Sequence, residues 1–501
     1  MRLLPVFRAV AATLVGGVIL LAGIEATLRL AGWEARVPGA RDPYLNVTPF
    51  FRPAVRRDGV RVLRHLEGPV EFLADKPANG FRVFVLGESS VAGFPYAVQH
   101  AFPAFLQARL AAALPAHRVE VVNCGVTGIA SWHVLRIARE IARYAPDVVV
   151  VYAGHNDWVL REPSGASAIL GALARLRFYQ LAVRAGAQLR RARHGPLDVD
   201  AANDPEQPLA IMDRLRGRDL LSDADRVRIT ARFADRLAET LAVARAAGAL
   251  PVASTLAQNL RDWEPGASRH RPDLPARDRP RWERRLVAGD RFRAVGDCPR
   301  ALALYASAGR IDERPAILHF ARARCLEHRG AWDRARDEYQ RASDLDELPL
   351  GAPSALNPVI RDRAAAAQAA FVDVAGALAA ESPHGLVGDE LFYDYLHFNL
   401  RGNERVATIL GGWLRALGRP TPAGTWQGDS YRDPDPEAIR AADPELRARE
   451  HLMRFGLLLM LDRAEEARHD REEVLRLAPA WRPFVERIAR DWPGPPRRVV
   501  F

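Results

Sequence analysis

Lysine and cysteine are nearly absent from this chain, and these shortages limit the classes of protein to which it can belong. Lys76 is the single lysine among 71 basic residues, so arginine carries almost all of the positive charge behind the formal balance of +10. Three cysteines in no CxxC arrangement, Cys124, Cys298 and Cys325, exclude a disulfide scaffold and are expected to be small buried thiols. No zinc-finger spacing, RNA-binding signature or basic run alternating with aromatics is present, so no nucleic-acid partner is expected.

One uncharged run stands at the N terminus, over residues 9–24 between Arg8 and Glu25. With its flanks it is long enough to span a bilayer. A cleaved signal peptide is the alternative, but no small-residue cleavage site directly follows the run. We therefore predict a cytoplasmic tail over 1–8 and an uncleaved transmembrane anchor over 9–31. Basic residues ahead of the run favour an extracytoplasmic location for the rest of the chain.

The chain is too long for one ordinary domain, and its residue composition and hydrophobic pattern change along its length. Residues 32–78 are rich in proline and arginine and are interpreted as a connecting segment with one hairpin. Beyond them, short apolar runs alternate with helical stretches, which predicts an α/β fold with a parallel sheet covered on both faces. The expected strands are 81–87, 118–123, 147–154, 251–257 and 371–374, and the expected helices between the first three are 100–114 and 131–144.

Two stretches interrupt this α/β pattern. Residues 159–224 include a basic amphipathic helical segment, which either lies on a membrane surface or packs over the sheet as a lid. The second interruption is an internal repeat with a period of 34 residues. Six identities share this spacing: Gly296 and Gly330, Ala301 and Ala335, Tyr305 and Tyr339, Ala308 and Ala342, Asp312 and Asp346, and Pro315 and Pro349.

The repeated segment, 285–350, resembles the tetratricopeptide repeat, whose period is 34 residues. This resemblance implies an α-helical insertion that either docks a protein partner or braces the fold. A looser copy is expected within the C-terminal segment 418–501, where Ala467 and Pro479 keep the spacing but the aromatic residue is missing.

The stretch FVLGESSVAG, residues 84–93, places two serines directly after the first strand of the sheet. Ligands of open α/β sheets bind at this edge. The stretch lacks the Gly-Lys-Ser/Thr of a P-loop and the GxGxxG of a dinucleotide site. Val91 also stands where the GxSxG nucleophile elbow requires glycine. A serine at this edge still needs a base, a group that orients the base and donors for an oxyanion.

Later loops offer each of these groups. Residues 123–131, NCGVTGIAS, form a glycine-rich loop, and residues 154–157, GHND, contain an asparagine amide that can donate to an oxyanion. Asp394 and His397 lie three residues apart, which lets the carboxylate hold the imidazole while its other nitrogen faces a hydroxyl. His155 is interpreted as a residue that orients its loop. Asn259, Arg261 and Asp262 either border the pocket or belong to an ordinary loop.

Together the blocks GES, NxGxxG, GxND and DxxH, in this order, resemble the SGNH (GDSL-like) hydrolase superfamily over 79–265 and 352–417. The resemblance implies a three-layer α/β/α, flavodoxin-like fold. It implies Ser89 as nucleophile, backbone N–H of Gly128 and side-chain amide of Asn156 as oxyanion donors, His397 as general base and Asp394 as its orienter. Glu88 departs from the usual GDS block, where aspartate precedes the serine.

The resemblance implies a membrane-anchored serine esterase that acts on short-chain acyl or O-acetyl esters and needs no metal or cofactor. Two alternatives remain at this point. One is O-acetyl transfer on extracytoplasmic polysaccharide, and the other is an idle hydrolase core that serves as a scaffold through its repeats. The expected partners are a small-molecule or glycan ester, a protein at the helical repeats, and the membrane through the N-terminal helix.

Overall fold

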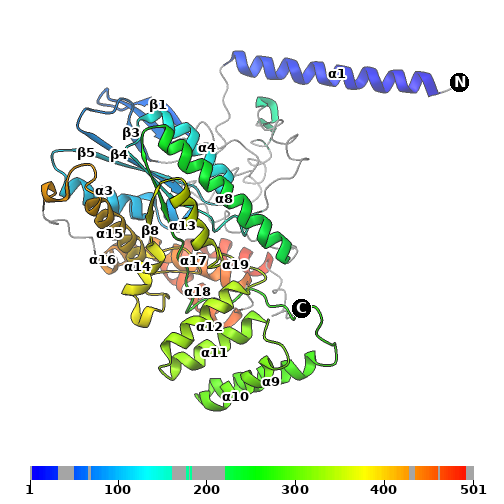
Figure 1. Ribbon diagram of the computed structural model, residues 1–501. Helices are drawn as coiled ribbons and strands as arrows, with labels where there is room; N and C mark the ends of the chain where they lie inside the picture. The colour runs from blue at the N-terminus through cyan, green and yellow to red at the C-terminus, as the bar shows by residue number, and fades with distance from the viewer. Residues whose placement is uncertain are drawn as a thin grey trace.

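A five-stranded parallel sheet forms the centre of the α/β domain (Figure 1). The computed structural model describes residues 3–31, 50–65, 69–160, 176–179, 181–182, 185, 221–427, 435–460 and 463–491. The strand order is β5-β4-β6-β7-β8, and every neighbouring pair is parallel. The bounds are Gly80–Gly87 for β4, Arg118–Gly125 for β5, Val148–Tyr152 for β6, Leu250–Ser254 for β7 and Ala370–Val372 for β8.

The sequence of the strands explains why both faces of the sheet are covered. Strand β6 reads VVVVY and all five residues are buried, as expected for β-branched residues in a central parallel strand. One face carries α4 (Ser131–Ile141), α8 (Asp223–Ala246) and α13 (Leu356–Ala366). The other face carries α3 (Phe102–Ala113), α15 (Leu400–Ala416) and, beside it, α14 (Val374–Glu381). The predicted α/β fold with helices on both faces is confirmed.

The segment before this sheet holds more structure than the predicted single hairpin. Three antiparallel strands, β1 (Phe51–Val55), β2 (Arg61–His65) and β3 (Glu71–Leu73), form a second small sheet. Phe72 meets Phe84 of β4 edge to face, with ring centroids 5.3 Å apart. The description of 32–78 as a connecting segment is therefore wrong from residue 51 onward, because its aromatic residues give it a core shared with the domain.

The N-terminal helix α1 runs over Leu3–Leu30 and extends away from the α/β domain (Figure 1). Within the residues described here, no helix combines the length and the apolar character needed to cross a membrane. The amphipathic stretch predicted within 159–224 lies almost entirely outside the described residues. Membrane attachment and the role of that stretch stay predictions.

The repeated segment forms two helical hairpins, α9 (Arg279–Ala294) with α10 (Cys298–Gly309) and α11 (Ala316–His328) with α12 (Trp332–Asp344). Gly296 and Gly330 end the first helix of each hairpin at φ of 79° and 72°, a left-handed conformation that glycine adopts without strain. Tyr305 and Tyr339 are buried at the equivalent positions. The first helix begins before the predicted boundary at 285, because Pro280 lies in its first turn, a favourable site for proline.

Equivalent aspartates join the two hairpins to one loop of the α/β domain. Asp312 accepts hydrogen bonds from the Arg271 backbone and the His270 ring, at 3.0 and 2.7 Å. Asp346 accepts from the backbone N–H groups of Gly266 and Ala267 at 2.8 and 2.9 Å. The insertion is therefore attached at two points, one period apart.

The C-terminal segment is helical as predicted. It comprises α16 (Pro436–Ala442), α17 (Pro444–Met460), α18 (Ala464–Leu477) and α19 (Arg482–Asp491). Helices α17 and α18 pack against each other around a buried apolar cluster that includes Phe455, Val474 and Val485. The three cysteines are buried and unpaired, in agreement with the prediction.

Candidate active site

Ser89 begins the one-turn helix α2 (Ser89–Ala92) directly after β4. Two glycines allow the turn because no side chain fits there. A Cβ on Gly87 would lie 2.2 Å from the carbonyl oxygen of Tyr152, and one on Gly125 would lie 2.1 Å from the backbone nitrogen of Ala92. The carboxyl ends of β4, β5 and β6 therefore converge beneath Ser89.

His397 connects Ser89 to Asp394. The Nε2 atom of His397 lies 2.7 Å from Oγ of Ser89, and its Nδ1 atom lies 2.7 Å from Oδ2 of Asp394. Asp394 is completely buried, and its Oδ1 also accepts hydrogen bonds from the backbone of Leu396 and His397. With Nδ1 donating to the carboxylate, Nε2 can accept the proton of the serine hydroxyl. These three residues, predicted from two separate blocks of the sequence, lie together.

Ser90, the other serine of the opening stretch, points elsewhere. Its hydroxyl donates to the backbone oxygen of Leu396 at 3.3 Å. The choice between the two serines therefore agrees with the geometry, because Ser89 is the one within hydrogen-bonding distance of a histidine.

Asn156 and Gly128 lie on adjacent loops. The side-chain amide of Asn156 donates to the backbone oxygen of Ile129 at 2.7 Å, next to Gly128. Gly128 has a φ of 76°, which glycine accommodates readily. The loops after β5 and β6 are thus joined at the residues predicted as oxyanion donors. Their donation to a substrate oxygen stays a prediction.

Glu88, the residue before Ser89, holds the loop after β6 in place. Its two carboxylate oxygens accept the backbone N–H groups of Gly154 and Asn156, at 3.0 and 2.9 Å. The side chain is buried, and this burial, followed by the nearby Asp157 carboxylate, raises the pKa of Glu88 well above its usual value. Glutamate, in place of the usual aspartate, therefore forms the hydrogen bonds that hold this loop.

Aromatic rings surround His397 on several sides. The centroid of Phe94 lies 4.8 Å from the imidazole centroid, that of Tyr395 lies 5.7 Å away, and Tyr393 stacks at 5.8 Å. Sequence reasoning missed these residues, although all three are neighbours of the GES and DxxH blocks. Aromatic residues flanking both blocks were the available signal.

Helix α17 covers both catalytic loops, and sequence reasoning did not anticipate this. Met453 packs with Phe94 and Tyr393 in one buried cluster. The phenol of Tyr96 donates to the carboxylate of Glu450 at 2.5 Å. Ser89 and His397 are each only 5% exposed in this arrangement. A local pattern could not reveal the contact, because it joins residues more than three hundred positions apart.

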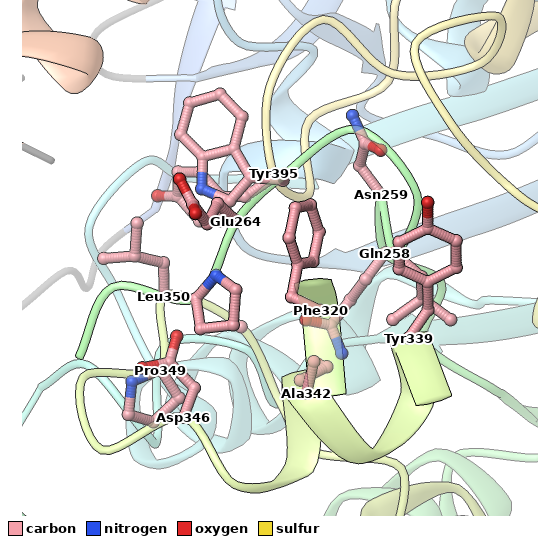
Figure 2. Close-up of a pocket in the computed structure, with 15 residues that line it drawn as sticks. Gln258, Asn259, Glu264, Phe320, Tyr339, Ala342, Asp346, Pro349, Leu350 and Tyr395 are labelled. Atoms are coloured by element: carbon pink, nitrogen blue, oxygen red, sulfur yellow. The ribbon is translucent and has the colours of Figure 1, made fainter. Parts of the chain in front are cut away.

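A cavity lies beside the His397 loop, between the α/β domain and the repeats (Figure 2). Tyr395, whose ring contacts His397, forms part of its wall with Trp263, and their centroids are 5.7 Å apart. Figure 2 shows the ring of Phe320, from α11, at the centre of the view, between Gln258 and Leu350. Carboxylates and amides line the cavity along with these rings: Glu264, Asp346, Gln258 and Asn259.

Asn259 supports the loop that carries Asp394. Its amide donates to the backbone oxygen of Asp394 at 3.1 Å and to the carboxylate of Asp389 at 2.7 Å. It therefore both borders the cavity and positions the loop. Among the described residues, no group of three or more His, Cys, Asp or Glu side chains could hold a metal ion.

A parallel α/β sheet with a serine, a histidine and an aspartate in hydrogen-bonded succession at its carboxyl edge has the arrangement of a serine hydrolase. Residues 85–217 match the GDSL-like Lipase/Acylhydrolase family model. The α/β domain is a GDSL-like (SGNH) hydrolase domain, and the chain is an ester-hydrolysing enzyme. The matched range includes Ser89, Gly128 and Asn156 and ends before Asp394 and His397.

Three solved structures are similar to this chain at 12–14% sequence identity. The crystal structure of TesA is 14% identical, covering 67% of this chain and 99% of its own, with a TM-score of 0.29. An acetyl xylan esterase, AlAXEase, is 12% identical, covering 67% and 100%, with a TM-score of 0.30. A lipase/acylhydrolase from Enterococcus faecalis is 13% identical, covering 70% and 100%, with a TM-score of 0.28. No curated protein matches the chain.

Proposed function

We propose that this protein is a serine esterase in which Ser89 attacks an ester carbonyl while His397 accepts its proton. Asp394 keeps the imidazole in the tautomer that presents a free nitrogen to the hydroxyl. The backbone N–H groups of Ser89 and Gly128 and the amide of Asn156 stabilise the tetrahedral oxyanion. The alcohol leaves with the proton held by His397, and water activated by the same residue releases the acid.

The contact between Ser89 and His397, 2.7 Å across 308 residues of sequence, is the observation that carries this proposal. The test combines labelling by a fluorophosphonate with hydrolysis of p-nitrophenyl acetate. Ser89→Ala should lose the label and nearly all turnover. Ser90→Ala is the matched control, because the Ser90 hydroxyl donates to a backbone oxygen and not to His397. This variant should keep both the label and the turnover. Equal labelling of the two variants contradicts the mechanism.

We propose an O-acyl ester of a carbohydrate as the substrate class. The small cavity of Figure 2, with room for about 40 Å³, supports this because its amide and carboxylate groups can bond one sugar hydroxyl beside the ring that contacts His397. A few placed polar groups of this kind fix the orientation of a bound hydroxyl. The indole nitrogen of Trp263 is buried without a partner among the described residues, which leaves a donor for such a hydroxyl.

A comparison of two substrates tests this class. Trp263→Phe keeps an aromatic ring and removes the indole donor, so hydrolysis of an acetylated sugar should fall about tenfold or more. Hydrolysis of p-nitrophenyl acetate, which has no hydroxyl groups, should change little. Equal effects on both substrates contradict a carbohydrate subsite at this cavity.

We also propose that residues 9–31 anchor the protein in a membrane with the catalytic domain extracytoplasmic. The uncharged run between Arg8 and Glu25 supports this proposal. Extraction of membranes with alkaline carbonate should leave the full chain in the pellet, and protease added outside intact cells should digest the catalytic domain. Release of the full chain by carbonate contradicts the anchor.

A further inference from the structure

His155 occupies the middle of the loop that Glu88 fixes beside the nucleophile. The residues on either side of it, Gly154 and Asn156, both donate their backbone N–H groups to the Glu88 carboxylate. The imidazole is 2% exposed, and its centroid lies 6.0 Å from that of Tyr152 at the end of β6. Its backbone position is therefore set by the same turn that carries Ser89.

The one hydrogen bond of the His155 ring fixes its tautomer. The backbone N–H of Ala352 donates to Nδ1 at 3.2 Å, so Nδ1 is an acceptor and carries no proton. In a neutral imidazole the other nitrogen then carries the hydrogen. Nε2 is consequently an N–H donor. It is buried and has no hydrogen-bond partner among the residues that the structure describes.

The electrostatic surroundings keep this ring neutral. Burial and, after it, the nearby His397 lower the pKa of His155 to about 3, while Asp394 opposes the shift. His397 becomes positively charged when it takes the serine proton, and a second positive charge beside it would be unfavourable. A neutral N–H is the form that can stabilise negative charge there without competing for the proton.

A buried donor without an acceptor costs free energy of folding, and a catalytic role is one of the explanations for such a group. We propose that Nε2–H of His155 donates a hydrogen bond to an oxygen of the bound ester, in addition to the donors already assigned. This inference rests on the proposed esterase function. It gives His155 contact with the substrate, whereas the sequence alone indicated only a residue that orients its loop.

Two substitutions separate contact with substrate from support of the loop. The side-chain amide of asparagine can place its oxygen near the position of Nδ1, whereas that of glutamine can place its nitrogen near Nε2. His155→Asn therefore keeps the acceptor for Ala352 and removes the donor. His155→Gln keeps the donor and removes the acceptor.

The expected result is a fall in kcat of about a hundredfold for His155→Asn on p-nitrophenyl acetate, with a smaller change in KM, as for loss of one oxyanion donor. His155→Gln should stay within about tenfold of the wild type. Thermal unfolding of both variants, followed by circular dichroism, reports the loop-supporting role separately.

The reverse order, with His155→Asn active and His155→Gln inactive, overturns the inference and assigns His155 to loop support. Equal kcat values for the two variants also overturn it. Fluorophosphonate labelling of the wild type distinguishes these outcomes from failure of the esterase itself. A wild type that neither labels nor hydrolyses the ester overturns the proposed function, and this inference with it.

Discussion

The carboxylate of Glu88 and the backbone nitrogen of Asn156 lie 2.9 Å apart, which ties the residue before the nucleophile to a predicted oxyanion donor. Both oxygens of Glu88 accept backbone N–H groups in a buried environment. Any change at Glu88 should therefore move the position of Asn156 relative to Ser89.

Glu88→Gln should lower kcat and destabilise the fold by about 1–3 kcal/mol, because an amide nitrogen would face one of the two backbone donors. Glu88→Asp, which restores the usual residue, keeps both acceptors on a shorter side chain and should be milder. Hydrolysis of p-nitrophenyl acetate and urea unfolding measure the two effects. A fully active Glu88→Gln variant would show that the loop needs no such tie.

The raised pKa of Glu88 gives a pH signature. Because the folded state holds this proton more tightly than the unfolded state, the contribution of Glu88 to stability is present below its ordinary pKa. That contribution is lost as pH rises through the raised value. The free energy of unfolding of the wild type should therefore fall with rising pH relative to Glu88→Gln. Parallel curves from pH 5 to 8 contradict this assignment.

His155 should show the opposite pH dependence. Its pKa of about 3 lies below the ordinary value of 6.5, so the unfolded state binds the proton more readily between these limits. Its contribution to stability is present above pH 6.5 and declines as pH falls toward 3, at about 1.4 kcal/mol for each pH unit. His155→Asn should lose stability less steeply on acidification, measured by urea unfolding between pH 4 and 7.

The packing of α17 on Phe94 and Tyr393 is expected to affect both folding and activity. Met453→Ala removes a side chain that packs on Phe94 and Tyr393 and should destabilise the chain by about 2–4 kcal/mol. It should also shift the pH dependence or KM of ester hydrolysis, because the rings around His397 lose support. Leu417→Ala is a suitable control, since that side chain is 46% exposed on the surface. Identical kinetics in the two variants would exclude a contribution of α17 to the site.

Gly87 and Gly412 offer a matched pair for the turn at Ser89. Alanine at Gly87 would clash with the backbone of Tyr152 and with Val91, so Gly87→Ala should prevent folding or abolish activity. Gly412 lies in α15 with open space around its Cα, so Gly412→Ala should stabilise the helix by up to about 1 kcal/mol. Soluble yield and thermal unfolding of the two variants check this contrast.

Features that depend on residues close together in the sequence could be predicted, whereas features that depend on contacts between distant segments could not. Strand β6 and the blocks that hold Ser89 and His397 carry local signals, namely a run of valines and polar residues at strand ends. From those signals the parallel sheet and the proximity of the serine, histidine and aspartate could be predicted. The catalytic roles of these three residues are part of the proposed function.

The unpredicted features depend on contacts between distant segments. The contact of Tyr96 with Glu450 spans 354 residues, and neither residue stands out from its neighbours in the sequence. The third strand of the small sheet is only three residues long, too short for a periodic signal. The tie from Glu88 to the loop after β6 uses backbone donors, which no side-chain pattern records.

The distance along the chain between Ser89 and His397 has a consequence for biosynthesis. A ribosome completes the nucleophile long before it adds the histidine that would activate it, and the cover over both is synthesised later still. Nascent and prematurely terminated chains therefore contain the serine but lack its base. On the proposed mechanism, ester cleavage therefore requires a chain that has been synthesised beyond His397.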